Sequence, residues 1–72
     1  MTGQEIIAQN IRKEINKRGL KQRYVAERAG FDVRSFNNML TGRKIILAEY
    51  IPVIANALGV TPNDLFDTDQ PA

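Results

Sequence analysis

Apolar residues recur at helical spacing along most of the chain, and they predict a compact bundle of four to five short helices. The first apolar stripe consists of three isoleucines, each four residues from the next: Ile7, Ile11 and Ile15. Such residues share one face of a helix. Thr2 and Glu5 have the spacing of a capping box at its start, and Gly19 follows its predicted end at about Arg18. No segment alternates polar and apolar residues as a strand does, so the predicted fold class is all-α.

The segment 22–42 is predicted to form two of these helices with a three-residue turn between them. Three apolar residues share one face of the first helix: Val25, Ala26 and Ala29. Gly30 follows that helix, because glycine adopts the left-handed backbone conformation without a Cβ penalty. Lys21 precedes it, and lysine cannot accept hydrogen bonds from the free N–H groups of a helix start. We therefore expect the start of this helix to be less well fixed.

The second helix of the segment has one apolar face and one polar face. Asp32 is a favourable N-cap for it, and three residues predict its buried face: Phe36, Met39 and Leu40. At about 100° per residue, the opposite arc holds Val33, Arg34, Asn37, Asn38 and Thr41, with no acidic residue. Arginine can donate two hydrogen bonds to a guanine edge, asparagine can pair with adenine, and a small apolar group suits the thymine methyl. This arc is therefore a candidate surface for reading DNA.

Five positions of the segment match the signature of a known family. Gln22, Ala26, Gly30, Phe36 and Met39 fall where the helix-turn-helix unit of the phage repressor and Cro family places its characteristic residues. The flanking stretches INKRGLKQ, TGRK and IANALGVTPNDLF also look like that family, so the resemblance covers roughly residues 5–66. Lys21 departs from the family, which prefers serine or threonine there. The resemblance implies a lambda-repressor-like DNA-binding domain whose helix-turn-helix is formed by helices 2 and 3.

The resemblance and the helix geometry together imply roles for individual side chains. Contacts to base edges in the major groove are expected from helix 33–41, through Val33, Arg34, Asn37 and Asn38. Of these, Asn37 could equally bind a phosphate or water. Contacts to DNA phosphates are expected from Gln22, Thr41, Arg43 and Lys44. For Gln22, the amide groups of the helix N-terminus would assist.

The last third of the chain predicts a fourth helix that proline interrupts. Residues 46–58 carry a helical apolar period that ends at Gly59, and Leu47 is one of its apolar positions. Proline inside a helix removes a hydrogen bond and crowds the previous turn, at a cost of about 3 kcal/mol. We therefore expect a loose first turn from Leu47 and regular helix after Pro52.

A fifth, very short helix is expected to begin at Pro62, because proline suits the first helical position and Thr61 precedes it. It should run to about Phe66, with Leu65 and Phe66 closing the core. Residues 1–66 then form a single helix-turn-helix domain, and residues 67–72 form a polar, acidic tail that we expect to fray.

Charge is distributed unevenly along the 72 residues, of which 43% are hydrophobic and 25% are charged. All ten lysines and arginines lie in residues 1–44 with four acids, which gives 10 − 4 = +6, whereas residues 45–72 hold four acids and no base, which gives −4. A basic half of this kind suits a nucleic-acid partner. The chain has no cysteine, no signal peptide and no apolar run of about 18 residues, so we expect a cytoplasmic protein that does not enter membranes.

Most other function classes are not supported by the sequence. The chain has no histidine, no cysteine and no glycine-rich phosphate loop, so we expect neither an enzyme nor a metal or cofactor site. The predicted partners are double-stranded DNA and, at least on DNA, a second copy of the chain; no small-molecule ligand is expected. The predicted function is that of a small, repressor-like transcriptional regulator. The alternative is a protein-interaction module such as an antitoxin or adaptor.

Overall fold

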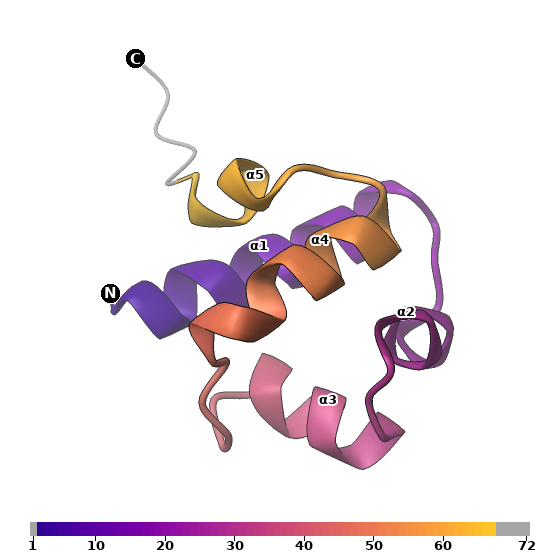
Figure 1. The fold of residues 1–72 in the computed structure, drawn as a ribbon, viewed down its shortest axis with the longest axis horizontal. Coiled ribbons are helices and arrows are strands. Elements are labelled where there is room, and N and C mark those ends of the chain that lie inside the picture. The colour runs from indigo at the N-terminus through magenta and orange to yellow at the C-terminus, as the bar shows by residue number, and fades with distance from the viewer. Residues whose placement is uncertain (1, 68–72) are drawn as a thin grey trace.

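The structure is a computed structural model that describes residues 2–67, and in this part of the chain it is entirely helical (Figure 1). The α-helices are α1 (Gly3–Lys17), α2 (Gln22–Ala29), α3 (Val33–Leu40), α4 (Ile51–Leu58) and α5 (Pro62–Phe66), and η1 (Ala48–Tyr50) is a 3-10 helix. The predicted all-α bundle is therefore confirmed. Of the tail predicted to fray, residues 68–72 lie outside the described residues. Within residues 2–67 no helix is long and apolar enough to cross a membrane.

The first helix begins with the predicted capping box. The Glu5 backbone N–H donates to Thr2 Oγ1 at 3.1 Å, and the Thr2 backbone N–H donates to Glu5 Oε1 at the same distance. Two of the four N–H groups that a helix start leaves without partners are often satisfied in this way. From this start α1 packs against α3 and α5. Ile7, Ile11 and Ile15 are buried, and Ile11 is fully so.

The core is formed by apolar side chains from all five helices together with Ile46 from the connection between α3 and η1. Phe36 is its largest fully buried residue. Phe31 lies at the edge of this core, where its ring stacks on Phe36 with centroids 6.0 Å apart and meets Tyr50 edge-on at 4.9 Å. Aromatic pairs in these two arrangements add attraction beyond the area they bury. The turn between α2 and α3 is thereby fixed to the start of α4.

Pro52 is accommodated at the start of α4 rather than inside it. The predicted loose first turn is the 3-10 helix η1, and the α-helix begins at Ile51, one residue before the proline. At the second helical position the missing N–H of proline would have had no partner in the helix. The expected interruption is therefore an ordinary helix start.

Two apolar residues of the predicted last helices, Leu47 and Phe66, are exposed. Leu47 keeps 44% of its surface accessible, because it precedes η1 with an extended backbone and is not part of the α4 face. Phe66 keeps 51% accessible, because it ends a five-residue helix that turns only Leu65 fully inward. The prediction that Phe66 closes the core was therefore wrong, and Leu47 does not share the buried face of α4.

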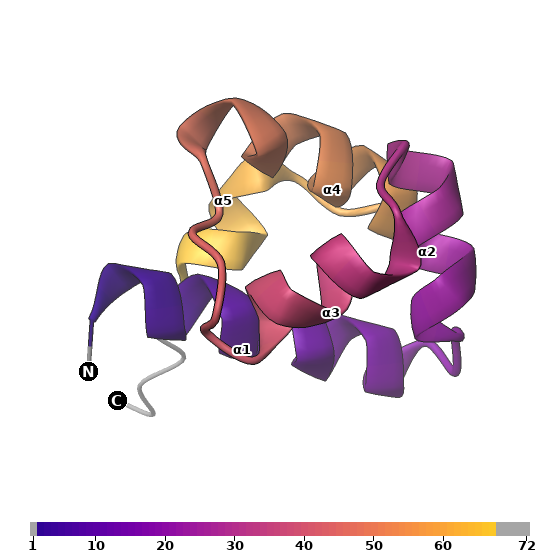
Figure 2. The same ribbon diagram turned by 90° about the horizontal axis from the view of Figure 1, so that it is seen from below.

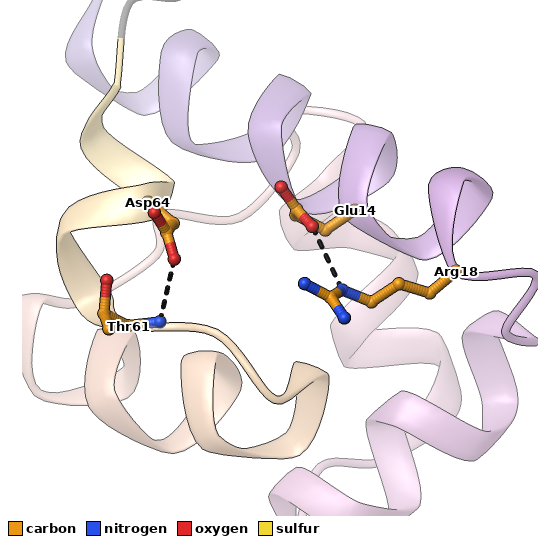
Figure 3. A network of polar contacts seen from close by, with 4 residues as sticks. All are labelled: Glu14, Arg18, Thr61 and Asp64. Atoms are coloured by element: carbon orange, nitrogen blue, oxygen red, sulfur yellow. Dashed lines mark hydrogen bonds and ion pairs between the residues drawn. The ribbon is translucent and has the colours of Figure 1, made fainter.

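Polar contacts hold α5 in place despite its shortness. Thr61 and Asp64 form a second capping box, in which the Thr61 backbone N–H donates to Asp64 Oδ2 at 3.0 Å (Figure 3). Separately, Glu14 of α1 and Arg18, which caps the end of that helix, form an ion pair at 3.1 Å that stabilises the end of α1 itself (Figure 3). The buried Asn10 side chain joins the two helices, since its Nδ2 donates to the carbonyl oxygen of Leu65 at 2.9 Å. The short last helix is thus tied to α1.

Candidate nucleic-acid interface

The turn between α2 and α3 has the geometry that the sequence predicts. Gly30 has a φ of +82°, a conformation that a residue with a Cβ adopts only with strain. Around it, the Phe31 N–H donates to the Ala26 carbonyl at 2.8 Å and the Gly30 N–H donates to the Glu27 carbonyl at 3.1 Å. This pair of bonds closes the end of a helix and reverses the chain direction. Ala26 is fully buried, so α2 and α3 can cross closely.

The two helices of this unit begin differently. Asp32 caps α3, and its carboxylate accepts a hydrogen bond from the Ser35 N–H at 3.3 Å. This acid is thereby directed at the amide groups of its own helix. Lys21 precedes α2 and makes no side-chain cap, as expected, and the first turn of α2 contains no acid. The N–H groups at the start of α2 therefore remain available to an anion.

Helix α3 lies along the lower edge of the molecule in Figure 1, and the view from below in Figure 2 brings it to the front. Its inner face is closed by Phe36, Met39 and Leu40, each at most 2% exposed. Arg34, Asn37 and Thr41 are exposed on the opposite side, whereas Val33 and Asn38 are half-buried. Val33 also packs against the core, so only part of its side chain is accessible. The polar arc predicted from the sequence is thus a surface of the fold.

A direct hydrogen bond connects this arc with the start of α2. Nε2 of Gln22, which is half-buried, donates to Oδ1 of Asn37 at 3.1 Å. The sequence pointed to both residues as contacts for DNA, but it gave no sign that they bind each other. The bond fixes the Asn37 carboxamide in one orientation on the outer face of α3.

The connection from α3 to η1, residues 41–47, contains the remaining predicted contacts. Thr41, Arg43 and Lys44 are all exposed there. Gly42, with a φ of +85°, ends α3. The Arg43 N–H donates to the Asn38 carbonyl at 2.8 Å, and the Gly42 N–H donates to the Met39 carbonyl at 3.4 Å. These bonds turn the chain sharply away from α3, so the basic side chains lie immediately beyond its end.

Two further side chains hold this loop, and the sequence did not indicate either. Gln4 binds both the N–H and the carbonyl of Ile46, and Nη1 of Arg12 donates to the carbonyl oxygen of Leu40. Arg12 makes this contact although the residue as a whole is exposed. The partners lie 42 and 28 residues away along the chain, so no local sequence pattern could reveal these contacts.

Electrostatics around the arc favour an anion. Helix α3 has no acid in its first turn, and Arg43 and Lys44 follow its end. Glu5 is an exposed acid at the start of α1, and hydrogen bonds from the backbone and then the hydroxyl of Thr2 hold its pKa below the ordinary value of 4.5. Among residues 2–67, no three acidic side chains lie close enough together to hold a metal ion. Helix α3 can therefore approach a polyanion, which the basic residues after its end and the uncapped N–H groups at the start of α2 can bind.

Comparison with known proteins agrees with this geometry. A helix-turn-helix family model matches residues 11–65. The fold is similar to the crystal structure of the restriction-modification controller protein C.AhdI from Aeromonas hydrophila, with a TM-score of 0.81, 25% sequence identity, and coverage of 88% of this chain and 96% of that one. No curated protein sequence matches the chain. The family match spans more than half of the chain, and the chain therefore belongs to the helix-turn-helix family of DNA-binding regulators, of the Cro/C1 type.

Proposed function

We propose that the protein is a small, repressor-like transcriptional regulator that binds double-stranded DNA in a sequence-specific manner. Helix α3 lies in the major groove in this proposal, and residues 1–66 form the binding domain. The observation that carries the proposal is the division of α3 into a fully buried apolar face and an exposed face with a guanidinium and carboxamides but no acid. The buried face of such a helix fixes it to the core, and its exposed face can approach a polyanion without repulsion.

Base contacts come from the exposed arc. Arg34 reaches a guanine edge, Asn37 and Asn38 reach adenine or a neighbouring acceptor, and the accessible part of Val33 meets a thymine methyl. The residues nearest the start of a recognition helix enter the groove most deeply, which places Arg34 in the leading position. Each good bidentate contact discriminates against a wrong base by about 1–3 kcal/mol.

Phosphate contacts lie on both sides of α3. At one side Gln22 and the uncapped N–H groups of α2 bind a phosphate, supported by the partial positive charge of the helix start. At the other side Thr41, Arg43 and Lys44 bind the backbone from the loop that follows α3. Two flanking groups of this kind would fix the orientation of α3 in the groove without reading the sequence themselves.

A homodimer, formed at least on DNA, completes the proposal. Two-fold regulators of this fold bind half-sites about 34–36 Å apart. Phe66, at the end of α5, exposes 51% of its surface, and a second copy that covers it would remove apolar area from water. Sedimentation with and without a palindromic duplex tests this step, and a monomer that binds single half-sites would exclude the dimer.

The neighbour's name, a restriction-modification controller, supports a regulatory role for this chain rather than an adaptor role. The alternative of a protein-interaction module is not favoured by the family match. Titration of the ¹⁵N-labelled protein with duplex DNA tests the proposed surface. Amide signals of the α2 start, α3 and residues 41–44 should shift most, while those at the end of α5 should shift only as far as the proposed dimer forms on the DNA. Shifts centred on α5, or none at low salt, would contradict the proposal.

A further inference from the structure

We infer that α1 positions the phosphate-binding loop through two side chains that do not themselves contact DNA, Gln4 and Arg12. The loop is the segment 41–46, which follows α3 and carries three of the proposed phosphate contacts. The inference rests on the function proposed above, because it assigns a role to these residues in the same DNA interface. It goes further by naming what holds that interface in shape.

Gln4 binds the C-terminal end of the loop, at Ile46, to α1, and we call such a contact between α1 and the loop a tie. Its Oε1 accepts a hydrogen bond from the Ile46 N–H at 2.7 Å, and its Nε2 donates to the Ile46 carbonyl at 3.0 Å. A single carboxamide thus satisfies both polar groups of one loop residue. The Ile46 side chain is 2% exposed, whereas its neighbour Ile45 is 65% exposed. Ile46 is therefore a fixed point in a stretch that is otherwise turned toward solvent.

Arg12 forms the second tie, at the N-terminal end of the loop where α3 ends. Its Nη1 donates to the carbonyl oxygen of Leu40, the last residue of α3. The preceding carbonyls of that turn are already bound by N–H groups of the loop itself, and Arg12 supplies the partner that the chain does not. A cation also interacts favourably with the negative end of the helix dipole. Gln4 and Arg12 are eight residues apart, or about 12 Å along the helix axis, so the two contacts bracket the loop.

Between the two ties, the loop is not packed against α1. A cleft of about 580 Å³ lies there, lined on the α1 side by Gln4, Ala8 and Arg12 and on the loop side by Thr41, Lys44 and Ile45. In Figure 2 the connection after α3 crosses the first half of α1. Because apolar packing does not fill this space, the loop is positioned at its two ends, by these hydrogen bonds and by the buried side chain of Ile46.

The consequence for DNA binding is specific. If a tie is lost, the loop occupies its binding geometry for a smaller fraction of the time, and the apparent affinity falls by that fraction. The same phosphates are neutralised once the complex forms, so the slope of affinity against salt concentration stays the same. Loss of a direct phosphate contact would instead reduce that slope by about one. The two roles can therefore be separated by one titration series.

The test uses Gln4→Met, which preserves length and removes both hydrogen bonds, with two control variants. Gln9→Met changes a residue of the same helix and the same cleft, for which the described part of the chain shows no hydrogen bond. Ile54→Val removes one methyl group from the buried face of α4, outside the proposed DNA and dimer surfaces, and controls for a general loss of stability. The measurements are amide hydrogen exchange of free protein, thermal unfolding, and affinity for duplex DNA at four salt concentrations.

We expect Gln4→Met to speed exchange of the Ile46 amide and to weaken DNA binding about five- to tenfold at an unchanged salt slope. Gln9→Met should match the unchanged protein, and Ile54→Val should lower the unfolding temperature without this loss of affinity. Equal affinity in Gln4→Met and Gln9→Met would overturn the inference, as would a slope reduced by about one. Failure of the unchanged protein to bind duplex DNA would contradict the proposed function instead, and the exchange rate of Ile46 would still decide whether the tie exists.

Arg12→Met tests the second tie in the same series. Although this change removes a positive charge, a positioning residue should leave the salt slope as it was, and the affinity should fall. A slope lower by about one would show that Arg12 neutralises a phosphate directly, and it would overturn this half of the inference.

Discussion

Gln22 and Asn37 are joined by a 3.1 Å hydrogen bond from Nε2 of the glutamine to Oδ1 of the asparagine. Gln22 is the first residue of α2, and Asn37 lies on the exposed face of α3. With its oxygen held by Gln22, the Asn37 carboxamide directs its NH₂ group away from that partner, where it can donate to an acceptor on a base. A proposed phosphate contact and a proposed base contact are thus coupled.

This coupling should appear in a double-mutant cycle on DNA affinity. Gln22→Ala removes a phosphate contact and also releases Asn37, so part of the Asn37 contribution is lost with it. We expect the combined loss in Gln22→Ala/Asn37→Ala to be smaller than the sum of the single losses by about 0.5–1 kcal/mol. The pair Arg34 and Lys44, for which the described residues show no mutual contact, serves as the control. Additive losses at Gln22 and Asn37 would argue against the coupling.

Lys44 should act as a pure phosphate contact. Lys44→Met is expected to weaken binding by a similar factor on all DNA sequences and to lower the salt slope by about one. Lys17→Met removes an equal charge from the last turn of α1 and should change the slope much less. The measurement is fluorescence anisotropy with one specific and one unrelated duplex at several salt concentrations. A loss confined to the specific duplex would refute this role.

The uncapped start of α2 should be open to stabilisation. Lys21 has an extended backbone and offers no acceptor to the free N–H groups of the helix. Lys21→Ser supplies a hydroxyl acceptor and should stabilise the fold by about 1 kcal/mol, which raises the unfolding temperature by about 4–8 °C in a domain of this size. Lys21→Ala removes the same charge without supplying an acceptor and is the matched control. Equal unfolding temperatures for the serine and alanine variants would contradict the prediction.

Glu5 should contribute to stability in a pH-dependent manner. Because hydrogen bonds from Thr2 lower the pKa of Glu5 in the folded protein, folding is favoured by the ionised form. This contribution is fully present above the ordinary pKa of 4.5 and is lost as the pH falls through the lowered folded-state pKa. Unfolding temperatures of the unchanged protein and of Glu5→Gln should therefore differ at pH 6 and converge at low pH. A constant difference across this range would contradict the assignment.

The helices could be predicted from the sequence because their boundaries depend on local signals. Thr2 and Glu5 are three residues apart, Asp32 stands next to the helix it caps, and Gly30 ends α2 through its own backbone conformation. The exposed side of α3 followed from the helical period alone. The burial of residues at the ends of the elements did not follow from that period, since the exposure of Leu47 and Phe66 depends on where other elements end.

Contacts between distant residues could not be predicted. The contacts from Gln4 to Ile46 and from Asn10 to Leu65 join residues 42 and 55 positions apart. A single glutamine or asparagine in a polar helix face is compatible with a solvent-exposed position, and only the packing of the bundle brings its partner within reach. The individual roles of the arc residues toward bases and phosphates stay predictions.

The most direct test of the central claim is selection of double-stranded DNA from a random library at two salt concentrations, with the unchanged protein and Arg34→Ala in parallel. The account predicts a palindromic consensus for the unchanged protein, an affinity that falls steeply with salt, and a loss of about 1–3 kcal/mol of base discrimination at one position of each half-site in Arg34→Ala. No enrichment at either salt concentration, or a consensus that is identical in Arg34→Ala, would contradict it.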